Sequence, residues 1–390
     1  MIGCTKLLCG TATVSDIVKY GRSSRELPPN MLQFSSDATP IVVWNMTNRC
    51  NLGCRHCYIE AEDRAYGSEL NTKEAKAFID DLANIAVPVL LFSGGEPLMR
   101  SDLFELGAYA RTKGIRAVIS TNGTLITPAV ARRIKETGFQ YVGVSIDGTE
   151  DIHDQFRGRK GCFNDALAGI RNSLAAGNKT GIRFTINKLN QHTLPDILDI
   201  VEQEKIPRFC MYHLVYAGRA KDMAELDTTG LEKQQTIDLL MERTIDFYNR
   251  GVEVEILTTD NHADGIYILQ YFERNQPERV PEIKALLEMH GGCSAGQKMA
   301  NVDPLGNVHA CQFWGHRTLG NVREKSFEDI WQTTQDEFLQ KMRSKGKHVE
   351  GRCGECRYKS LCCGCRIRAE AVSGNIWGED PACYLTDWKE

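Results

Sequence analysis

Two features are missing from the sequence, and each absence narrows what the chain can do. Residues 1–10, MIGCTKLLCG, lack the long apolar segment of a secretory signal, and no run of about 18 apolar residues marks a membrane span. An excess of positive charge is also missing, since 47 Lys and Arg face 51 Asp and Glu, a formal net charge of -4. We therefore expect a cytoplasmic protein with no membrane span and no broad positive field for nucleic acid.

Cysteine, by contrast, is abundant, with 15 residues in a chain of 390. A disulfide framework fits poorly with a protein that is not exported, because the cytosol keeps thiols reduced. Metal or cluster ligation is the leading interpretation. Cys162 and Cys210 lie in a predicted helix start and a predicted strand and are expected to be core thiols. The sequence gives no reason to treat Cys4 and Cys9 as ligands.

From residue 41, short β-branched runs alternate with amphipathic segments. We expect strands in IVVWNMT, VLLFS, RAVIST, YVGVS, GIRFTIN and RFCMYHLVY, the first at residues 41–47 and the last at 208–216. Helices are predicted to begin at the capping box 71–74, near residues 101, 127, 166 and 194, and over about 230–250. This alternation favours parallel strands with crossover helices, as an open sheet or a partial (β/α) barrel.

Polar residues follow four successive predicted strands. They form SGGE, STNG and SIDG, and then Thr185 with Asn187. Each motif alone is often only a βα turn. Because the carboxyl ends of parallel strands meet at one mouth, four in succession favour a site there.

The chain is too long for the usual single domain, so we expect more than one. Residues 1–40 are interpreted as an N-terminal extension and residues 41–260 as the alternating domain. The rhythm breaks after about residue 260. Residues 261–390 are rich in Gly and Cys, which predicts a second domain organised by metal.

The first cysteine motif, CxxxCxxC, consists of Cys50, Cys54 and Cys57 directly after the first predicted strand. A structural zinc site takes four ligands in a closed tetrahedron. A [4Fe-4S] cluster held by three thiolates leaves one iron open for another molecule. The missing fourth ligand therefore favours an open iron–sulfur cluster.

This motif, in its βα context, resembles the radical S-adenosylmethionine (SAM) superfamily. The resemblance implies a partial (β/α)6 TIM-type barrel and a [4Fe-4S] cluster on Cys50, Cys54 and Cys57, whose open iron binds SAM and whose electron generates a 5′-deoxyadenosyl radical. It also implies that Gly94 and Gly95 let the backbone approach SAM and that the Glu96 carboxylate receives the methionyl ammonium. The remaining SAM contacts that it implies are His56 near adenine and the strand-end residues Ser120, Asn122, Ser145, Asp147 and Asn187.

The C-terminal cysteines resemble the SPASM extension, which carries auxiliary iron–sulfur clusters. By analogy, one cluster is held by Cys353, Cys356, Cys362 and Cys383, and the other by Cys293, Cys311 and Cys365, with Cys363 as a candidate fourth ligand. The pattern departs from the family at Cys365, which follows Cys362 after two residues instead of three. The resemblance thus implies one or two auxiliary clusters. For the CxxC segment alone, a zinc ribbon is the alternative.

A narrower resemblance covers nearly the whole chain, through MIGCTKLLCG, LQFSSDATPIVVWNMTNRCNLGCRHCY and CCGCRIRA. These segments are similar to radical SAM enzymes that process tetrapyrrole side chains. The resemblance implies removal of acetate arms from didecarboxysiroheme to give iron-coproporphyrin in haem biosynthesis, with an electron donor such as ferredoxin or flavodoxin. The alternatives are propionate removal in haem d1 formation, modification of a peptide, and a non-catalytic iron–sulfur electron carrier.

A substrate with several carboxylates needs cations in the mouth of the barrel. The candidates are Arg157, Arg159, Lys160, Arg183 and Arg219, although each alone is more often a solvated surface charge. His213 or His262 is a candidate ligand for a substrate iron, with a hydrogen-bonded core histidine as the alternative.

Overall fold

The structure is a computed structural model that describes residues 1–11 and 38–389. Its strands are β1 Ile2–Gly3, β2 Ile41–Asn45, β3 Val89–Ser93, β4 Arg116–Thr121, β5 Val142–Ser145, β6 Thr180–Ile186, β7 Arg208–His213, β8 Glu255–Thr259, β9 Met299–Val302, β10 Asn307–His309 and β11 Gly320–Asn321. Its helices are α1 Cys4–Cys9, α3 Thr72–Asn84, α4 Leu103–Thr112, α5 Pro128–Thr137, α6 Glu150–Arg157, α7 Cys162–Ala175, α8 Leu194–Gln203, α9 Gly230–Asn249, α10 Ala263–Asn275, α11 Val280–His290, α12 Phe327–Trp331, α13 Glu337–Arg343, α14 Gly351–Glu355 and α15 Arg366–Ser373.

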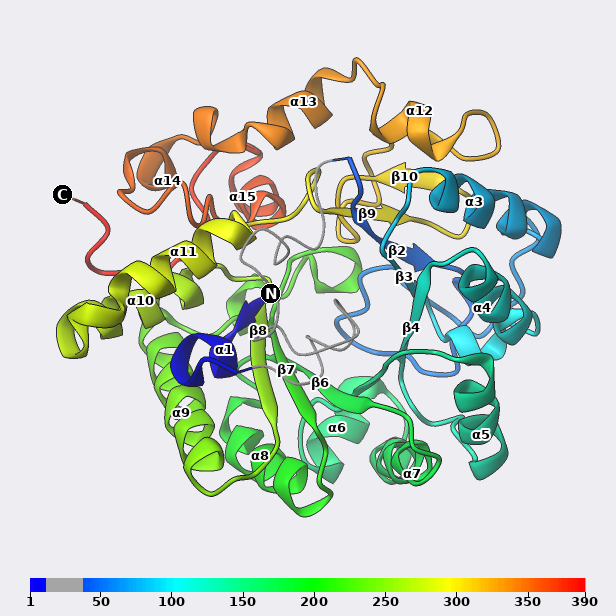
Figure 1. Ribbon diagram of the computed structural model, residues 1–390, viewed down its shortest axis with the longest axis horizontal. Coiled ribbons are helices and arrows are strands. Elements are labelled where there is room, and N and C mark those ends of the chain that lie inside the picture. Colours follow the sequence, from blue (N-terminus) through cyan, green and yellow to red (C-terminus); the bar gives the residue numbers. More distant parts are fainter. Residues whose placement is uncertain (12–37, 390) are drawn as a thin grey trace.

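The strands form one curved sheet in the order β1-β8-β7-β6-β5-β4-β3-β2-β9-β10-β11. From β2 to β8 every neighbouring pair is parallel. The helices that follow these strands lie on the outside of the arc (Figure 1). The predicted partial barrel and all six of its predicted strands are confirmed, and β8 extends the parallel series by one strand that was not predicted.

Several of these helices begin at the N-cap residues that were predicted from the sequence. The Asn71 side chain accepts hydrogen bonds from the backbone N–H groups of Lys73 and Glu74, and Glu74 returns one to the backbone N–H of Asn71, so the capping box is confirmed. At the start of α5 the Thr127 side chain accepts a hydrogen bond from the Val130 N–H, with Pro128 in the first turn. The apolar faces of these helices pack on the sheet and enclose the main core around Trp44, Phe92, Phe184 and Phe209.

Segments before and after the parallel series extend the sheet at its two edges. The described part of the predicted extension contributes β1, which pairs antiparallel with β8, and residues 12–37 lie outside the described residues. On the other edge, β9 pairs parallel with β2, so the cysteine-rich segment continues the barrel sheet before α12 to α15 (Figure 1). The domain boundaries at residues 40 and 260 stay predictions. In the described ranges, no helix is long and apolar enough to cross a membrane.

Candidate active site

A cleft opens at the carboxyl ends of the parallel strands, where the strand-end residues were predicted to meet. It is enclosed by the loop that carries the first cysteine motif and by a segment that follows Cys311. Most of the predicted site residues line it: Cys50, Cys54, His56, Cys57, Gly94, Gly95, Ser120, Asn122, Ser145, Arg157, Arg183 and His213. The lining does not include Glu96, Asp147, Asn187, Arg159 or Arg219.

The cysteine loop is held against the barrel by backbone contacts. The Cys50 N–H donates to the Glu62 carbonyl at 3.1 Å, which closes the loop on itself. Arg219 then donates from Nε to the Cys54 carbonyl at 2.8 Å and from Nη1 to the Ala61 carbonyl at 3.1 Å. Arg219 therefore orders the loop, and its predicted contact with substrate stays untested.

Three free thiols of this loop face the cleft together. Cys50 and Cys54 are buried and Cys57 is half-buried. Burial raises the pKa of the Cys50 thiol to about 12, so its thiolate needs a positive partner such as a metal centre. In the described residues, no group of three His, Cys, Asp or Glu side chains is close enough to hold a single metal ion.

The glycine motif after β3 packs directly on the cysteine loop. A Cβ atom at Gly94, whose φ is +130°, would lie 2.5 Å from the Thr47 carbonyl oxygen. A Cβ at Gly95 would lie 2.3 Å from the Arg49 carbonyl oxygen, and the Gly95 N–H donates to the Thr47 carbonyl at 2.7 Å. Only glycine permits this close approach of two backbones, which positions the cleft wall beside the thiols.

Glu96 lies behind this wall. Its Oε1 accepts from the Leu98 N–H at 3.1 Å and the Thr121 hydroxyl at 2.7 Å, and its Oε2 accepts from the Asn122 N–H at 2.8 Å. Burial raises the pKa of this fully enclosed carboxyl to about 7, although the hydrogen bonds oppose that shift. Glu96 thus ties β3 to the end of β4, while a direct contact with the ammonium of SAM stays a prediction.

An ion pair of Arg157 and Asp147 lies beside Cys54. Arg157 donates from Nη1 to Cys54 Sγ at 3.5 Å, and its Nη2 forms an ion pair with Asp147. Burial acts to raise the pKa of the Asp147 carboxyl, but Arg157 and His56 outweigh burial and hold that pKa below its usual value. Arg157 is therefore engaged with the Cys54 thiol and a carboxylate, and its predicted contact with substrate stays a prediction.

His56 forms an aromatic wall of the cleft. Its ring stacks on Phe156 with a centroid separation of 4.5 Å and an interplanar angle of 13°. Burial lowers the pKa of His56 to about 4, so the ring is neutral near pH 7. Its Nδ1 is buried and has no hydrogen-bond partner. A bound group with a donor at this position would satisfy that atom.

The other strand-end residues divide into two sets. Asn122 donates to Asn51 Oδ1 at 2.8 Å and approaches Cys50 Sγ at 3.9 Å, so it sits beside the thiols. Ser120 contacts the guanidinium of Arg183. Asn187 is enclosed and accepts from the Leu189 N–H at 2.9 Å, which makes it part of a loop that lies behind the cleft.

The wall opposite the cysteine loop is made by β6 and β7. Arg183 donates from Nε to the Tyr212 hydroxyl at 2.8 Å, and its guanidinium lies over the Tyr212 ring. His213 Nε2 is 2.9 Å from Asp264 Oδ2, and the Tyr384 hydroxyl donates to the other oxygen of Asp264 at 2.8 Å. His213 Nδ1 is buried without a partner. Arg159, by contrast, forms an exposed ion pair with Asp165.

Several residues that line the cleft were not predicted from the sequence. Tyr58 follows Cys57 directly, and its ring meets Phe313 edge-on at 5.2 Å. Gln312 and Phe313 follow Cys311, so the C-terminal segment supplies part of the cleft. Asp260 lies just past β8, the strand that was not predicted. Adjacency to a cysteine ligand was the one available signal for Tyr58, Gln312 and Phe313.

The C-terminal thiols gather into two groups. The first, called the inner cysteine group, is Cys293, Cys311 and Cys365, which share one apolar cluster with Val215 and Trp314. The second, the outer cysteine group, is Cys353, Cys356, Cys362 and Cys383. Burial raises the pKa of the Cys362 thiol, and Cys383 and Cys353 lie close enough to add to that shift.

Cys363 lies between the two groups. Burial raises the pKa of its thiol to about 11, and both Cys293 and Cys353 are close enough to contribute to that shift. Its Sγ donates to the Lys359 carbonyl at 2.8 Å, and its φ is +60°. The inner group shares one apolar cluster, whereas Cys353 of the outer group lies in a different apolar cluster from Cys356, Cys362 and Cys383. The allocation of the thiols to clusters and their roles as ligands stay predictions.

A parallel barrel with three cysteines at its mouth, joined to a segment with further cysteine groups, defines a radical SAM enzyme with auxiliary clusters. The Radical SAM superfamily profile matches residues 44–201, and the SPASM profile, described as an iron–sulfur cluster-binding domain, matches residues 293–357. The chain belongs to the radical SAM superfamily and carries a SPASM domain. Proteins of this class bind SAM and [4Fe-4S] clusters, and the donor set fits them: free thiols at the cleft, a backbone wall of glycines and the unpaired His56 Nδ1.

Two relatives cover almost the same length. The chain is 51% identical over 390 residues to the Fe-coproporphyrin III synthase of Methanosarcina barkeri, covering 99% of this chain and 98% of the relative. It is 40% identical over 350 residues to the pre-heme d1 synthase of Dinoroseobacter shibae, covering 89% of this chain and 86% of the relative.

Solved structures agree on the fold. SuiB of Streptococcus suis bound to S-adenosylmethionine matches with a TM-score of 0.71 at 18% identity, over 89% of this chain and 78% of that one. Native anSMEcpe with bound AdoMet matches with a TM-score of 0.69 at 19% identity, over 88% of this chain and 94% of that one. At this level of identity the likeness concerns the fold alone.

Proposed function

We propose that this enzyme removes acetate side chains from didecarboxysiroheme and produces iron-coproporphyrin III for haem biosynthesis. The observation that carries this proposal is the 51% identity, over 99% of the chain, to an Fe-coproporphyrin III synthase. The 40% identity to a pre-heme d1 synthase makes propionate removal from the same class of macrocycle the second candidate.

The cleft has features that suit a flat, carboxylated macrocycle. The rings of Tyr58, Phe313 and Tyr212 line the cleft, and the guanidinium of Arg183 lies over the Tyr212 ring. A guanidinium in such a partly dry cleft binds a carboxylate more strongly than one in water. These contacts support a tetrapyrrole substrate with acidic arms.

His213 supports an iron-containing substrate. Its Nε2 is held by Asp264, so the tautomer with the proton on Nε2 leaves a lone pair on Nδ1. A histidine that ligates a metal commonly donates its other ring N–H to a carboxylate in this way. We infer that His213 would be a candidate ligand of the substrate iron.

Cys50, Cys54 and Cys57 would hold the cluster, which together with SAM would supply a carbon radical able to take a hydrogen atom from the substrate. Residues of the barrel position the three thiols and the loop that carries them. Arg157 and Asn122 orient the thiols, and the glycine wall at Gly94 and Gly95 fixes the distance between loop and strand.

Removal of each acetate arm consumes one further electron and one proton. Loss of an arm as the acetate radical leaves a ring double bond, and the electron and proton convert that radical to acetate. Gln312 and Phe313 line the cleft directly after Cys311, so the inner cysteine group lies beside the substrate region. This neighbourhood supports a role in electron handling, with ferredoxin or flavodoxin as the class of external donor.

The test is anaerobic incubation with SAM, dithionite and didecarboxysiroheme, followed by mass analysis of the tetrapyrrole. We expect stepwise loss of two acetate arms together with 5′-deoxyadenosine. Propionate loss with both acetates retained would select the haem d1 activity. SAM cleavage without tetrapyrrole turnover would favour a peptide substrate, and SAM binding without cleavage would favour an electron carrier.

A matched pair of variants tests the substrate wall. Arg183→Gln should raise KM for the tetrapyrrole by roughly 10-fold or more, because a charge-assisted hydrogen bond is lost. Arg171→Gln is the control, since Arg171 is an exposed partner of Glu204 away from the cleft. Equal KM values in both variants would show that the carboxylates bind elsewhere.

A further inference from the structure

Arg366, at the start of α15, is a fully buried cation without a carboxylate partner. Its side chain is 0% exposed. Its Nη1 donates to the Ile376 carbonyl at 2.9 Å, its Nη2 donates to Cys353 Sγ at 3.6 Å, and its Nε has no partner. In residues 1–11 and 38–389, no Asp or Glu forms an ion pair with Arg366.

A buried guanidinium of this kind needs a negative charge beside it, because an isolated charge is expensive to remove from water. The side chain of Asp380 lies near Arg366, since both contact the position of Gly364, but the Asp380 carboxylate is already paired with Arg368. Its Oδ1 accepts from Arg368 Nε at 2.9 Å and its Oδ2 from Arg368 Nη2 at 2.8 Å. The remaining negative group is the thiolate of Cys353 and whatever anionic centre that thiolate holds.

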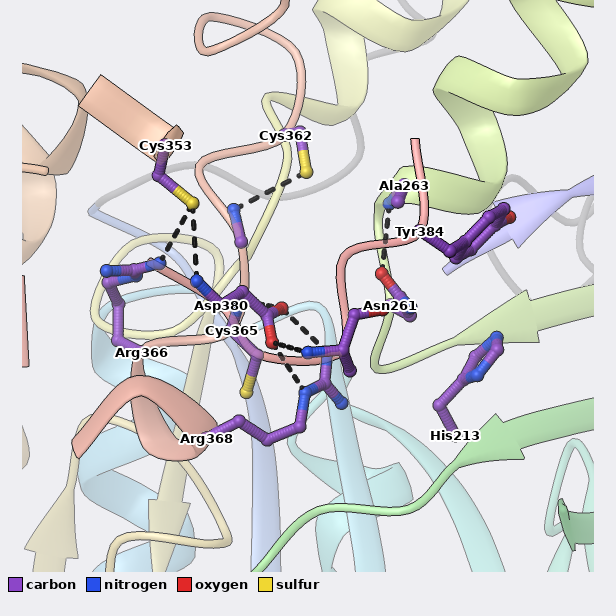
Figure 2. Close-up of polar contacts among 12 residues, drawn as sticks. His213, Asn261, Ala263, Cys353, Cys362, Cys365, Arg366, Arg368, Asp380 and Tyr384 are labelled. Carbon is purple, nitrogen blue, oxygen red and sulfur yellow. Dashed lines mark hydrogen bonds and ion pairs between the residues drawn. The ribbon is translucent and has the colours of Figure 1, made fainter. Parts of the chain in front are cut away.

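Asp380 connects the two C-terminal cysteine groups. Its backbone N–H donates to Cys353 Sγ at 3.4 Å, and its Oδ2 accepts from the Cys365 N–H at 2.7 Å. Arg368 extends the network to the barrel through a bond from Nη1 to the Leu214 carbonyl at 3.2 Å. Figure 2 shows Arg366 and Asp380 converging on Cys353 while Arg368 holds Asp380 from the other side. Cys353 therefore receives two N–H···S bonds from a rigid frame.

We propose that Arg366 is the counter-cation of an iron–sulfur cluster on the outer cysteine group and raises the reduction potential of that cluster. This inference rests on the proposed assignment of Cys353, Cys356, Cys362 and Cys383 as ligands of one cluster, and not on the identity of the substrate.

The physical reason is electrostatic. Each one-electron reduction makes a cluster more negative by one charge, and hydrogen bonds and positive charge at its sulfurs stabilise the more negative state. Arg366 supplies both at once in a site with little water, where the interaction is strong. The electron comes from an external reductant such as dithionite and is returned to an oxidant mediator in a titration.

The barrel cluster has a different environment. Arg157 also donates to a thiol, Cys54 Sγ, but the adjacent Asp147 carboxylate offsets its charge. Arg366 has no such carboxylate. The outer cluster is therefore expected to hold its electron at a higher potential than the SAM cluster, which suits an electron relay or reservoir and leaves the SAM cluster the stronger reductant.

The experiment is a redox titration of the anaerobically purified full chain, monitored by electron paramagnetic resonance (EPR). The signal of the outer cluster is the one that disappears in Cys356→Ser. In Arg366→Gln its midpoint should shift to a more negative potential, with the midpoint of the SAM cluster unchanged. Arg366→Lys keeps the charge and should shift less. An unchanged midpoint in Arg366→Gln at full iron content overturns the inference.

Arg357→Gln is the matched control. Arg357 follows the ligand residue Cys356, but its guanidinium bonds to the Tyr358 hydroxyl at 2.6 Å and to Asp387 at 2.9 Å and not to sulfur. Its loss should leave the potential of the outer cluster unchanged. A shift equal to that of Arg366→Gln would mean that any nearby cation acts in the same way, which overturns the specific role.

A second measurement covers the case in which Arg366→Gln loses iron. Wild-type protein with ¹⁵N-labelled arginine should show, by pulsed EPR, a guanidinium nitrogen coupled to the reduced outer cluster. Absence of that coupling overturns the inference. A wild-type chain without iron on the outer group overturns both the inference and the cluster assignment, whereas the predicted shift in a protein that does not convert didecarboxysiroheme supports the inference and refutes only the proposed substrate.

Discussion

Removal of the three barrel cysteines should delete one cluster and leave the others intact. Cys50, Cys54 and Cys57 belong to a separate small apolar cluster, while Cys293, Cys311 and Cys365 of the inner cysteine group lie in another. If each of the three groups holds a four-iron cluster, the wild-type chain carries about 12 irons. Changing Cys50, Cys54 and Cys57 to Ala should then leave about 8 irons and abolish SAM cleavage.

Cys162 is the matched control for this experiment. It packs in the same apolar cluster as Cys50 and Cys54, but its Sγ donates to Asp154 Oδ1 at 3.3 Å. Cys162→Ala should therefore keep all of the iron and cleave SAM. The assay is iron and sulfide quantitation on anaerobically purified protein, with EPR of the reduced clusters and chromatography of 5′-deoxyadenosine.

Three results would refute this reasoning. Iron retained at the wild-type level in the triple variant would mean that the barrel thiols hold no cluster. A loss of iron from all groups at once would show that the clusters depend on one another. Zinc at one or two equivalents with little iron would replace the cluster interpretation by a zinc protein.

Two further changes test the wall beside the thiols. Gly95→Ala should displace the cysteine loop and lower the affinity for SAM, because its Cβ would lie 2.3 Å from the Arg49 carbonyl oxygen. Gly53→Ala, in the cysteine loop itself, is the control, since its Cβ would meet open space and SAM affinity should be unchanged. Equilibrium dialysis measures both affinities. Glu96, with its pKa raised to about 7 by burial, stabilises the fold when protonated, so this stabilisation is complete below pH 4.5 and is lost as the pH rises towards 7. Relative to Glu96→Gln, the free energy of unfolding of wild type should fall by up to about 3 kcal/mol over that range, and a difference independent of pH would contradict this assignment.

The protonated state of Glu96 is compatible with its surroundings. Thr121 Oγ1 lies 2.7 Å from Glu96 Oε1, and a hydroxyl accepts as readily as it donates. The change to Gln preserves the shape of the side chain and removes only the titration. Because both proteins share every other ionisable group, the difference between them isolates Glu96.

The order of elements was readable from the sequence because its causes are local. Asn71 and Glu74 form their capping box within one helical turn, and the alternation of apolar runs follows from the period of each strand and helix. β8 was missed, although the run at residues 255–259 is as buried as the predicted strands. It follows α9 closely, and the polar residues Asp260 and Asn261 that come after it were not recognised as a strand-end motif.

The candidate site was only partly predictable, since side-chain direction depends on distant partners. Arg157 was predicted to contact substrate on the strength of its charge, yet it lies on Cys54, which is 103 residues away in the chain. Arg219 donates hydrogen bonds to two carbonyls of the cysteine loop, and Arg159 forms an ion pair with Asp165 at the surface. A count of cations cannot distinguish these environments, because each depends on how the loops after β5 and β7 fold back.

The sequence by itself determined the chemistry, because CxxxCxxC, the glycine motif and the C-terminal thiols have ligand types and spacings that few other sites share. The tertiary structure alone decided which groups share an environment. It placed β9 beside β2, which brings Phe313 to the cleft, and it left Arg366 buried against Cys353 with no carboxylate. Ligand spacing is a short-range property of the chain, whereas burial and charge pairing arise only when segments that are distant in sequence exclude water together.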